Sequence, residues 1–593
     1  MTVFEVWAPE RDRVRLWLAA GGQRELTRDA SGWWRREVGG ADHGVDYGFL
    51  LDDADPDVEP DPDEPASGVL PDPRSRWQPA GVHAPSRTYD HARFEWSDRA
   101  WTGRQLAGSV LYELHVGTFT DEGTFDAAAG RLDHLVELGI DLVELLPVNA
   151  FNGTHGWGYD GVLWYAVHEP YGGPDGLKRF VDACHARGIG VVLDVVYNHL
   201  GPSGGHIGEF APYQTKDETG WGQSINLDGS DSDEVRRYIV DNACGWLRDY
   251  HVDGLRLDAV HALRDSRATH LLEELAVAVD ALAGHVGRPL SLIAESDLND
   301  ARLVAPRAAG GYGLDAVWDD DVHHAVHAAL TGERQGYYVD FGSLDTLAKA
   351  LTRAYVHDGD YSTFRRRSHG RPVDPVRTPG DAFVVYLQDH DQIGNRATGD
   401  RISQTLSAGL LKVGATLILT SPYTPMLFMG EEWAAGTPWQ FFASHPERKL
   451  ARAVTRGRRR EFAAHGWAGS VPNPQDPRTF RRSKLDWSEP GRAPHREILD
   501  LYRSLIALRK ARPELTDPRL DRVDVEYGDR WLVIRRTGLA VAANLGAFPS
   551  RLPLPETGDA VLLATDPRAT LDGDGVELPA ESAAVVRLGG PPA

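Results

Sequence analysis

The stretch DGLRLDAVH at residues 253–261 combines the pattern of a buried strand with ionisable side chains. Leu255 and Leu257 alternate along it, as the residues on one face of a strand do. Arg256 and Asp258 are two residues apart, so both lie on the same side of that strand. The guanidinium would keep the Asp258 carboxylate ionised, and an ionised carboxylate can act as a nucleophile. A structural ion pair is the alternative that this stretch alone leaves open.

Two more carboxyl groups follow apolar segments later in the chain. Glu295 comes directly after the apolar residues 292–294, which predicts a partly desolvated carboxyl group. Burial raises the pKa of a glutamate, as a general acid working near neutral pH requires. Asp391 closes the segment VVYLQDHD. Three histidines stand at the ends of similar segments, where neutral imidazoles could hydrogen-bond hydroxyl groups: His199, His261 and His390.

These residues need a scaffold that gathers the ends of strands, and the pattern from about residue 108 predicts one. Short apolar segments rich in β-branched residues alternate there with amphipathic helical segments. This alternation predicts an α/β protein with a parallel (β/α)₈ TIM barrel, whose catalytic residues lie at the carboxyl ends of its strands. Long loops after the third, sixth and eighth strands are then insertions on that face. The predicted strands are 109–116, 140–148, 189–199, 251–260, 289–296, 313–318, 382–391 and 424–430.

Both ends of the chain differ from this pattern. Short alternating segments separated by Gly, Asp and Pro predict an N-terminal β-sandwich at residues 1–90, with an acidic, solvated loop at 53–65. The helical periodicity stops after about residue 515, and residues 515–593 predict a C-terminal antiparallel β-sandwich. The barrel domain, with its insertions, would occupy residues 91–514.

The composition argues against several classes of partner. A formal net charge of −24 disfavours binding to nucleic acid or to anionic membranes, and no long apolar run could span a membrane. Cys184 and Cys244 fall in predicted helices and are expected to be reduced core residues rather than a disulfide. The first residues lack the pattern of a signal peptide. Together these features predict a cytoplasmic protein.

Three acids and three histidines at one face of a barrel suit cleavage at an acetal carbon. One carboxylate attacks, one carboxylic acid protonates the leaving oxygen, and a third anion stabilises positive charge. Metal binding is the main alternative, but no H-x-H or H-E-x-x-H spacing is present, so no metal and no cofactor are expected. Aromatic side chains predicted near this face suit stacking on pyranose rings, although each alone could be core packing: Trp157, Tyr159 and Trp318.

Four segments resemble the four signature regions of the α-amylase clan, glycoside hydrolase family 13. They are DVVYNH (194–199), GLRLDAVHAL (254–263), LIAES (292–296) and QDHDQIGNR (388–396), in the family's order. The resemblance implies that Asp258 is the nucleophile, Glu295 the acid/base, and Asp391 the residue that binds hydroxyls and stabilises the transition state. It implies retention of anomeric configuration, with the carboxyl groups of Asp258 and Glu295 about 5–5.5 Å apart. It also implies helper roles for Arg256, His199 and His390, and a stacking role for Tyr159.

Three further stretches, at 70–86, 311–342 and 391–401, resemble one branch of this family, whose members cleave the α-1,4 bond next to a terminal trehalose unit. The resemblance implies maltooligosyl trehalose and related α-glucans as substrates. Amylases of the family often bind calcium, but only Asn198 matches one of their ligands, so no required metal is expected. The candidates for shaping the trehalose pocket, each of which could instead be an ordinary residue of the sixth helix, are Trp318, Asp319, Asp320, His323 and His324.

Two alternatives stay open. A 1,4-α-glucan branching enzyme of the same family shares the N-terminal domain and the four motifs, but transfers glucan to a sugar hydroxyl instead of water. A catalytically silent glucan-binding protein would keep the fold without the chemistry, and the three intact carboxylates argue against it. The products formed from maltooligosyl trehalose and from amylose would separate the three.

Overall fold

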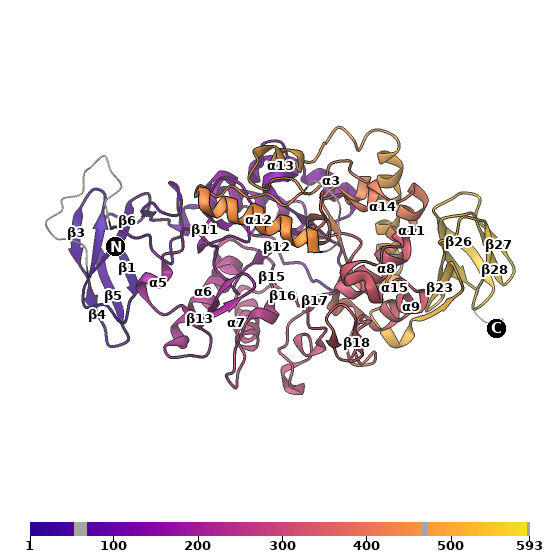
Figure 1. Ribbon diagram of the computed structural model, residues 1–593, viewed down its shortest axis with the longest axis horizontal. Coiled ribbons are helices and arrows are strands. Elements are labelled where there is room, and N and C mark those ends of the chain that lie inside the picture. Colours follow the sequence, from indigo (N-terminus) through magenta and orange to yellow (C-terminus); the bar gives the residue numbers. More distant parts are fainter. Residues whose placement is uncertain (53–67, 465–470, 590–593) are drawn as a thin grey trace.

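The computed structural model describes residues 1–52, 68–464 and 471–589. Three parts follow one another along the longest axis of the molecule, namely N-terminal sheets, a central barrel and C-terminal sheets (Figure 1). The predicted acidic loop at 53–65 lies outside the described residues. The change from sheets to barrel falls between Arg87 and Leu111, and the boundaries at residues 90 and 514 stay predictions.

The predicted barrel is confirmed, with all eight strands in the expected segments. The strands form one closed, parallel barrel in the order β12-β15-β16-β17-β20-β21-β8-β9. Every residue of these strands is buried, which explains why their segments are continuously apolar rather than alternating. The strands are β8 (Leu111–Leu114), β9 (Leu142–Leu145), β12 (Gly190–Val195), β15 (Gly254–Leu257), β16 (Ser291–Ala294), β17 (Ala316–Trp318), β20 (Phe383–Tyr386) and β21 (Thr424–Phe428).

Amphipathic helices surround the barrel, with one departure from a regular alternation. No α-helix forms between β16 and β17, where the chain makes only two 3₁₀ turns, η4 (Ala301–Leu303) and η5 (Arg307–Ala309). Pro306, Gly310 and Gly311 interrupt this segment, because neither residue type favours a continuing helix. The main barrel helices are α3 (Leu132–Leu138), α4 (Gly173–His185), α6 (Ser232–Asp249), α7 (Leu271–Val286), α8 (Asp320–Thr331), α11 (Ala408–Leu419) and α14 (His495–Ala511).

The register of β15 fixes the level at which the catalytic segment leaves the barrel. Leu257 pairs with Val195 on one side and with Ala294 on the other. Asp258 and Glu295 each follow their strand by one residue, so both backbones leave the sheet at the same level on adjacent strands.

The two ends of the chain form separate pairs of sheets, as predicted. The N-terminal part has a three-stranded sheet, β1-β5-β4, and a four-stranded sheet, β3-β2-β6-β7. The C-terminal part has a five-stranded sheet, β22-β23-β24-β29-β26, and a three-stranded sheet, β25-β28-β27, both antiparallel. The bounds are β1 (Thr2–Trp7), β2 (Val14–Leu18), β3 (Gly22–Glu25), β4 (Thr27–Arg28), β5 (Trp33–Val38), β6 (Asp46–Leu51), β7 (Ser86–Arg87), β22 (Asp524–Tyr527), β23 (Trp531–Arg536), β24 (Leu539–Asn544), β25 (Ser550–Pro553), β26 (Gly558–Ala564), β27 (Thr570–Asp572), β28 (Gly575–Leu578) and β29 (Ser582–Leu588).

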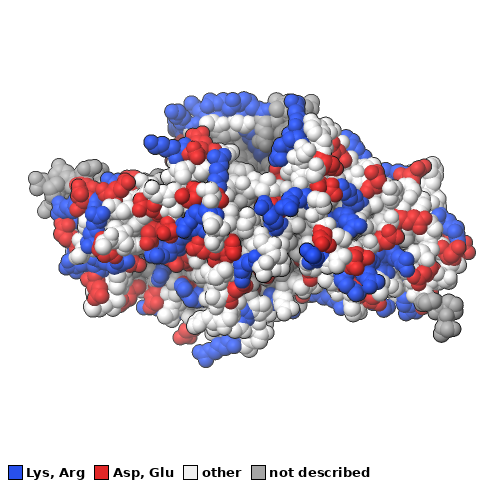
Figure 2. Space-filling view, turned by 90° about the horizontal axis from the view of Figure 1, so that it is seen from below, with Lys and Arg blue, Asp and Glu red and all other residues white. Residues whose placement is uncertain are grey.

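Charge is distributed unevenly over the surface. Lys and Arg side chains gather in a row along the upper edge of the face seen in Figure 2. The helix α12 (Arg448–Ala464) is the most basic element, and six of its cations are exposed and form no ion pair with any residue that the structure describes. These six are Arg448, Lys449, Arg452, Arg456, Arg459 and Arg460.

Two further expectations concern the cysteines and the membrane. Cys184 in α4 is buried, Cys244 in α6 is half-buried, and both are unpaired thiols, as predicted. No helix within the described ranges has both the length and the apolar content needed to cross a membrane.

Candidate active site

The three predicted carboxylates lie at the carboxyl ends of three barrel strands. Asp258 follows β15, Glu295 follows β16, and Asp391 lies in the short helix α10 (His390–Gly394) after β20. Their side chains are 13%, 21% and 48% exposed, respectively. All three therefore keep a solvent-accessible side while the barrel encloses the rest.

Arg256 joins the two carboxylates on adjacent strands. Its buried guanidinium donates from Nη1 to Asp258 Oδ1 at 2.7 Å, and its Nη2 lies 3.7 Å from Glu295 Oε2. The other carboxylate oxygen of Asp258, Oδ2, accepts a hydrogen bond from Asn198 Nδ2 at 2.7 Å. Each Asp258 oxygen thus has a fixed donor, which holds the carboxylate in one orientation as an ionised nucleophile requires.

Glu295 has the environment of a general acid. Burial raises the pKa of Glu295 to about 8, against an opposing effect of Arg256, while the charges of Asp258, Asp320 and Asp391 raise it further. Ala259 N–H donates to Glu295 Oε2 at 2.6 Å, which orients the carboxyl group. Ala259 adopts φ 41° and ψ 50°, in the left-handed region, a strained conformation that places its N–H toward Glu295. The carboxyl group is therefore protonated at neutral pH.

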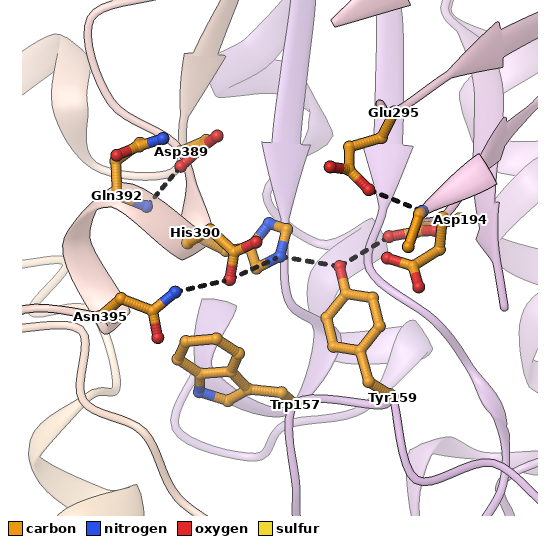
Figure 3. Close-up of polar contacts among 12 residues, drawn as sticks. Trp157, Tyr159, Asp194, Glu295, Asp389, His390, Gln392 and Asn395 are labelled. Carbon is orange, nitrogen blue, oxygen red and sulfur yellow. Dashed lines mark hydrogen bonds and ion pairs between the residues drawn. The ribbon is translucent and has the colours of Figure 1, made fainter. Parts of the chain in front are cut away.

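A chain of hydrogen bonds links the third strand to the seventh (Figure 3). The Tyr159 hydroxyl donates to Asp194 Oδ2 at 2.7 Å and lies 2.8 Å from His390 Nε2. His390 Nδ1 lies 2.5 Å from Glu113 Oε1. Burial lowers the pKa of His390, but the carboxylates of Glu113 and Asp391 outweigh burial and raise it to about 10. A cationic His390 therefore donates to both Tyr159 and Glu113.

Asp391 is held at the open edge of this network. Asn395 Nδ2 donates to its Oδ1 at 3.1 Å, and His390 Nε2 lies 3.7 Å from the same oxygen (Figure 3). A negative charge thus faces solvent beside a cationic imidazole. This is the position from which an anion can bind hydroxyl groups or stabilise developing positive charge.

The remaining predicted contact residues near these acids differ in exposure. The Tyr159 ring stacks on His390, and His199 Nε2 hydrogen-bonds the Tyr159 carbonyl at 3.0 Å. Trp157 is mostly buried, because its ring stacks on Trp439 and meets His390 edge-on. His261 is half-buried beside Glu295's loop, where its Nδ1 accepts from the Asp297 N–H at 3.3 Å.

Three predicted contact residues are almost wholly buried, and their part in shaping the substrate pocket stays a prediction. Trp318 is buried, and the Arg256 guanidinium lies over its ring, 4.4 Å from the ring centroid. His323 and His324 are buried on α8, where their rings pack against Tyr338. The helix is buried on all sides from Asp321 to Leu330, so both histidines are enclosed whichever face they occupy.

The acidic residues before these histidines have different positions. Asp319 is buried and caps α8 by accepting the Val322 N–H at 3.2 Å. Asp320 is only partly buried, and its Oδ1 accepts hydrogen bonds from Tyr386 at 2.7 Å and Gln392 at 2.9 Å. Asp320 also raises the pKa of Glu295, so it lies within electrostatic reach of the acid.

Several residues of this site were missed from the sequence. Asp194 opens the DVVYNH segment, and burial raises its pKa to about 7, although Arg256 lowers it. Glu113 is a charged residue inside the apolar strand β8, which was the available signal. Trp221 is 53% exposed at the tip of the β13 (Gln214–Thr219) and β14 (Gly222–Ile225) hairpin, and its ring lies 6.2 Å from His199 and 6.0 Å from His261.

The donor set does not form a metal site. Among the residues that the structure describes, no group of three or more His, Cys, Asp or Glu side chains could hold a metal ion. Asn198, the matched calcium ligand, gives its amide to Asp258 and has its carbonyl oxygen 2.5 Å from His199 Nδ1. That the activity requires no metal or cofactor stays a prediction.

An eight-stranded parallel barrel with a nucleophile on one strand and a buried acid on the next is the arrangement of an α-amylase-type glycoside hydrolase. The family model for the alpha amylase catalytic domain matches residues 90–221, and a domain of unknown function matches residues 518–585. A crystal structure of a Salmonella typhimurium protein assigned to the alpha amylases is 38% identical, with a TM-score of 0.88, over 99% of this chain and 97% of that one.

Curated relatives define the family more narrowly. The malto-oligosyltrehalose trehalohydrolase of Arthrobacter ramosus is 57% identical over 99% of both chains. That of Mycobacterium tuberculosis is 54% identical over the whole of both chains. The chain belongs to the malto-oligosyltrehalose trehalohydrolase family.

Proposed function

We propose that this chain hydrolyses the α-1,4 bond adjacent to the terminal trehalose of maltooligosyl trehalose, releasing trehalose and a maltooligosaccharide with retained configuration. The observation that carries the chemistry is the pairing of an Asp258 carboxylate fixed at both oxygens with a Glu295 whose raised pKa keeps it protonated. The family of the chain supports the substrate.

The first half of the reaction uses both carboxyl groups at once. Asp258 attacks the anomeric carbon while Glu295 gives its proton to the oxygen of the departing trehalose, forming a glycosyl–enzyme ester. Asp391, whose charge reaches Glu295, stabilises the positive charge that develops on the ring. Arg256 stays bound to Asp258 and limits the rotation of the nucleophile.

The second half reverses the role of Glu295. Having lost its proton, the Glu295 carboxylate takes a proton from water, which attacks the anomeric carbon and releases Asp258. The predicted spacing of about 5–5.5 Å between the two carboxyl groups leaves no room for water during the first step. That spacing stays a prediction.

Substrate binding is proposed for the side chains that reach solvent around the acids. The Tyr159 ring would form the floor under the sugar that is attacked. Trp221 and His261 would border the leaving-group side, because their rings lie 6.0 Å apart and His261 accepts the N–H of Asp297, two residues after Glu295. Asp320 would contribute at the edge of the binding site, by holding the Gln392 side chain and by raising the pKa of Glu295.

One experiment tests this proposal against both alternatives. The protein is incubated with maltooligosyl trehalose and, separately, with amylose, and the products are separated by chromatography. Release of free trehalose is expected. New branch points in amylose without trehalose would identify a branching enzyme, and no product from either substrate would identify a glucan-binding protein.

A matched pair of variants assigns the activity to the site. Glu295→Gln should lose trehalose release, because it removes the acid that protonates the leaving oxygen. Glu526→Gln is the control, since Glu526 is exposed on β22 and forms no ion pair within the described part of the chain. Equal activity of both variants would contradict the assignment. The cytoplasmic location expected from the sequence stays a prediction.

A further inference from the structure

His390 is clamped by a single carboxylate from the first strand of the barrel. Glu113 in β8 uses both of its oxygens: Oε1 lies 2.5 Å from the imidazole Nδ1, and Oε2 accepts the His390 backbone N–H at 3.1 Å. Both side chains are 1% exposed. A buried carboxylate and a buried imidazolium are each costly alone, so their pairing keeps a proton on Nδ1 and a positive charge on the ring.

The other ring nitrogen of His390 brings this charge to the active site. Nε2 lies 2.8 Å from the Tyr159 hydroxyl, which donates to Asp194 Oδ2 at 2.7 Å, and 3.7 Å from Asp391 Oδ1 (Figure 3). This contact is the only ion pair that Asp391 makes with a residue that the structure describes. The orientation of Tyr159 and the surroundings of Asp391 therefore both depend on the charge of His390.

Ionisable groups surround His390 on several elements, but few of them carry a charge. Burial lowers the pKa of His115 to about 3 and raises those of Glu144 and Asp389 well above the ordinary values, so these three groups are neutral at pH 7. Burial lowers the pKa of His390, and the charge of Glu113 is the largest of the contributions that raise it instead to about 10. The surrounding groups are Glu113 and His115 from β8 and the turn after it, Glu144 from β9, Tyr159, Asp194 from β12, and Asp389 and Asp391 at the start of α10.

We propose that Glu113 is a positioning residue that keeps His390 cationic, and that this cation holds the Tyr159 ring beneath the attacked sugar and Asp391 beside it. A hydrogen bond from a charged donor is roughly twice as strong as one between neutral groups, so an imidazolium holds Tyr159 more firmly than an imidazole does. This role of Glu113 rests on the proposed function, but the charge on His390 can be measured without any substrate.

The test compares two substitutions of equal size inside the barrel. Glu113→Gln removes the charge, while its amide can still donate to Nδ1 and accept the backbone N–H, so the hydrogen bonds are kept. Glu144→Gln is the matched control. Glu144 pairs in register with Glu113 on the neighbouring strand, is also 1% exposed, and is already neutral because burial raises its pKa well above the ordinary value.

The first readout is the charge of His390, measured by nitrogen NMR of the whole protein labelled with ¹⁵N-histidine. The His390 signal is identified by its absence from His390→Gln. We expect both ring nitrogens to be protonated from pH 5 to pH 9 in the parent and in Glu144→Gln, and Glu113→Gln to lose the proton within that range. The second readout is kcat/KM on whichever glucan the parent cleaves. Relative to the parent, Glu113→Gln should be within about twofold at pH 5 and about tenfold lower at pH 8.

The proposal is wrong if His390 is neutral at pH 7 in the parent, or if Glu113→Gln keeps its His390 proton up to pH 9. It is also wrong if Glu113→Gln lowers kcat/KM by the same factor at every pH, as a merely structural role would, or if Glu144→Gln has the same effect. Asp391→Asn, at a half-exposed position, decides the matter if Glu113→Gln does not fold: His390 should stay cationic in it at pH 7, and a neutral His390 would assign the effect to Asp391. If the parent releases no trehalose, the proposed function fails, while the NMR result still decides the role of Glu113.

Discussion

The raised pKa of Glu295 makes a prediction that can be tested by stability as well as by activity. Its pKa of about 8 in the folded protein compares with an ordinary value of 4.5, and one unit corresponds to about 1.4 kcal/mol. At pH 7 the unfolded chain holds this carboxyl ionised, whereas the folded protein holds it protonated. Folding must therefore add a proton to this carboxyl at pH 7, which is roughly 2.5 pH units above its pKa in the unfolded chain. This proton uptake costs about 3 kcal/mol.

The sign follows from the direction of the shift. Because the folded protein binds this proton more tightly, the contribution of Glu295 to stability is complete below pH 4.5 and is lost as the pH rises toward about 8. Glu295→Gln cannot ionise, and its amide oxygen can still accept the Ala259 N–H. The variant should match the parent at pH 4 and unfold with a free energy about 3 kcal/mol higher at pH 7.

Two assays measure this pKa independently. Denaturant unfolding of the parent, Glu295→Gln and Glu526→Gln between pH 4 and pH 9 gives the stability difference. The pH profile of kcat/KM on maltooligosyl trehalose should fall on the basic side with an apparent pKa of about 8. A glycosyl fluoride needs no protonated leaving group, so its profile should lack this fall. Glu295→Gln should largely keep kcat/KM on the fluoride, because this ratio reports the first step, while kcat falls because the second step has lost its base.

The reasoning would be refuted by specific results. A basic fall near pH 5 would show that Glu295 has an ordinary pKa. The same basic fall with both substrates would assign it to another group, such as Asp194, whose pKa of about 7 affects Tyr159 in either reaction. If the stability difference between the parent and Glu295→Gln does not change with pH, folding does not take up a proton at Glu295.

Four further substitutions test individual roles. Asp258→Asn should lower kcat on the natural substrate and on the glycosyl fluoride by about 10⁴-fold or more. If the variant still turns over either substrate, Asp258 is not the nucleophile. Trp221→Ala should raise KM about fivefold with a smaller change in kcat, because it removes an exposed ring from the rim, and an unchanged KM would exclude that ring from binding. Asp320→Asn should reduce the ratio of kcat/KM for maltooligosyl trehalose to that for plain maltooligosaccharide, and an unchanged ratio would count against Asp320. His324→Ala should lower the free energy of unfolding by about 2–4 kcal/mol without changing this kcat/KM ratio, because its ring is buried. A changed ratio with unchanged stability would show that His324 helps to select the substrate.

The barrel could be predicted because its signal is repeated. Each strand is a short apolar run bounded by turns, and eight of them in alternation with helices leave few other architectures. The same pattern placed Asp258 and Glu295 directly after their strands, where the structure has them, whereas the predicted seventh strand ends earlier than expected, at Tyr386, and Asp391 lies in α10. The missing helix after β16 was visible in Pro306 and two glycines, but the barrel tolerates a 3₁₀ connection there.

The supporting residues could not be predicted from the same pattern. The helix α8 is buried on all sides from Asp321 to Leu330, partly by Tyr338, which packs against His323 and His324, and the periodicity of DDVHHAVHAAL could not show this covering. The sequence did not show that the Arg256 guanidinium covers one face of the Trp318 ring. Trp221 depends on how a hairpin of two short strands folds over the barrel mouth, and that requires coordinates.

The hydrogen bonding between β15 and β16 separates chemistry from specificity in this protein. The Glu295 N–H donates to the Leu257 carbonyl at 2.9 Å, so the two backbones that carry the reacting groups are linked directly through the sheet. Trp221 and Asp320, two of the side chains proposed to border the sugar, follow other strands, namely β12 and β17. Loops could therefore be exchanged among relatives to change which sugar departs, while the stereochemical outcome is inherited with the barrel.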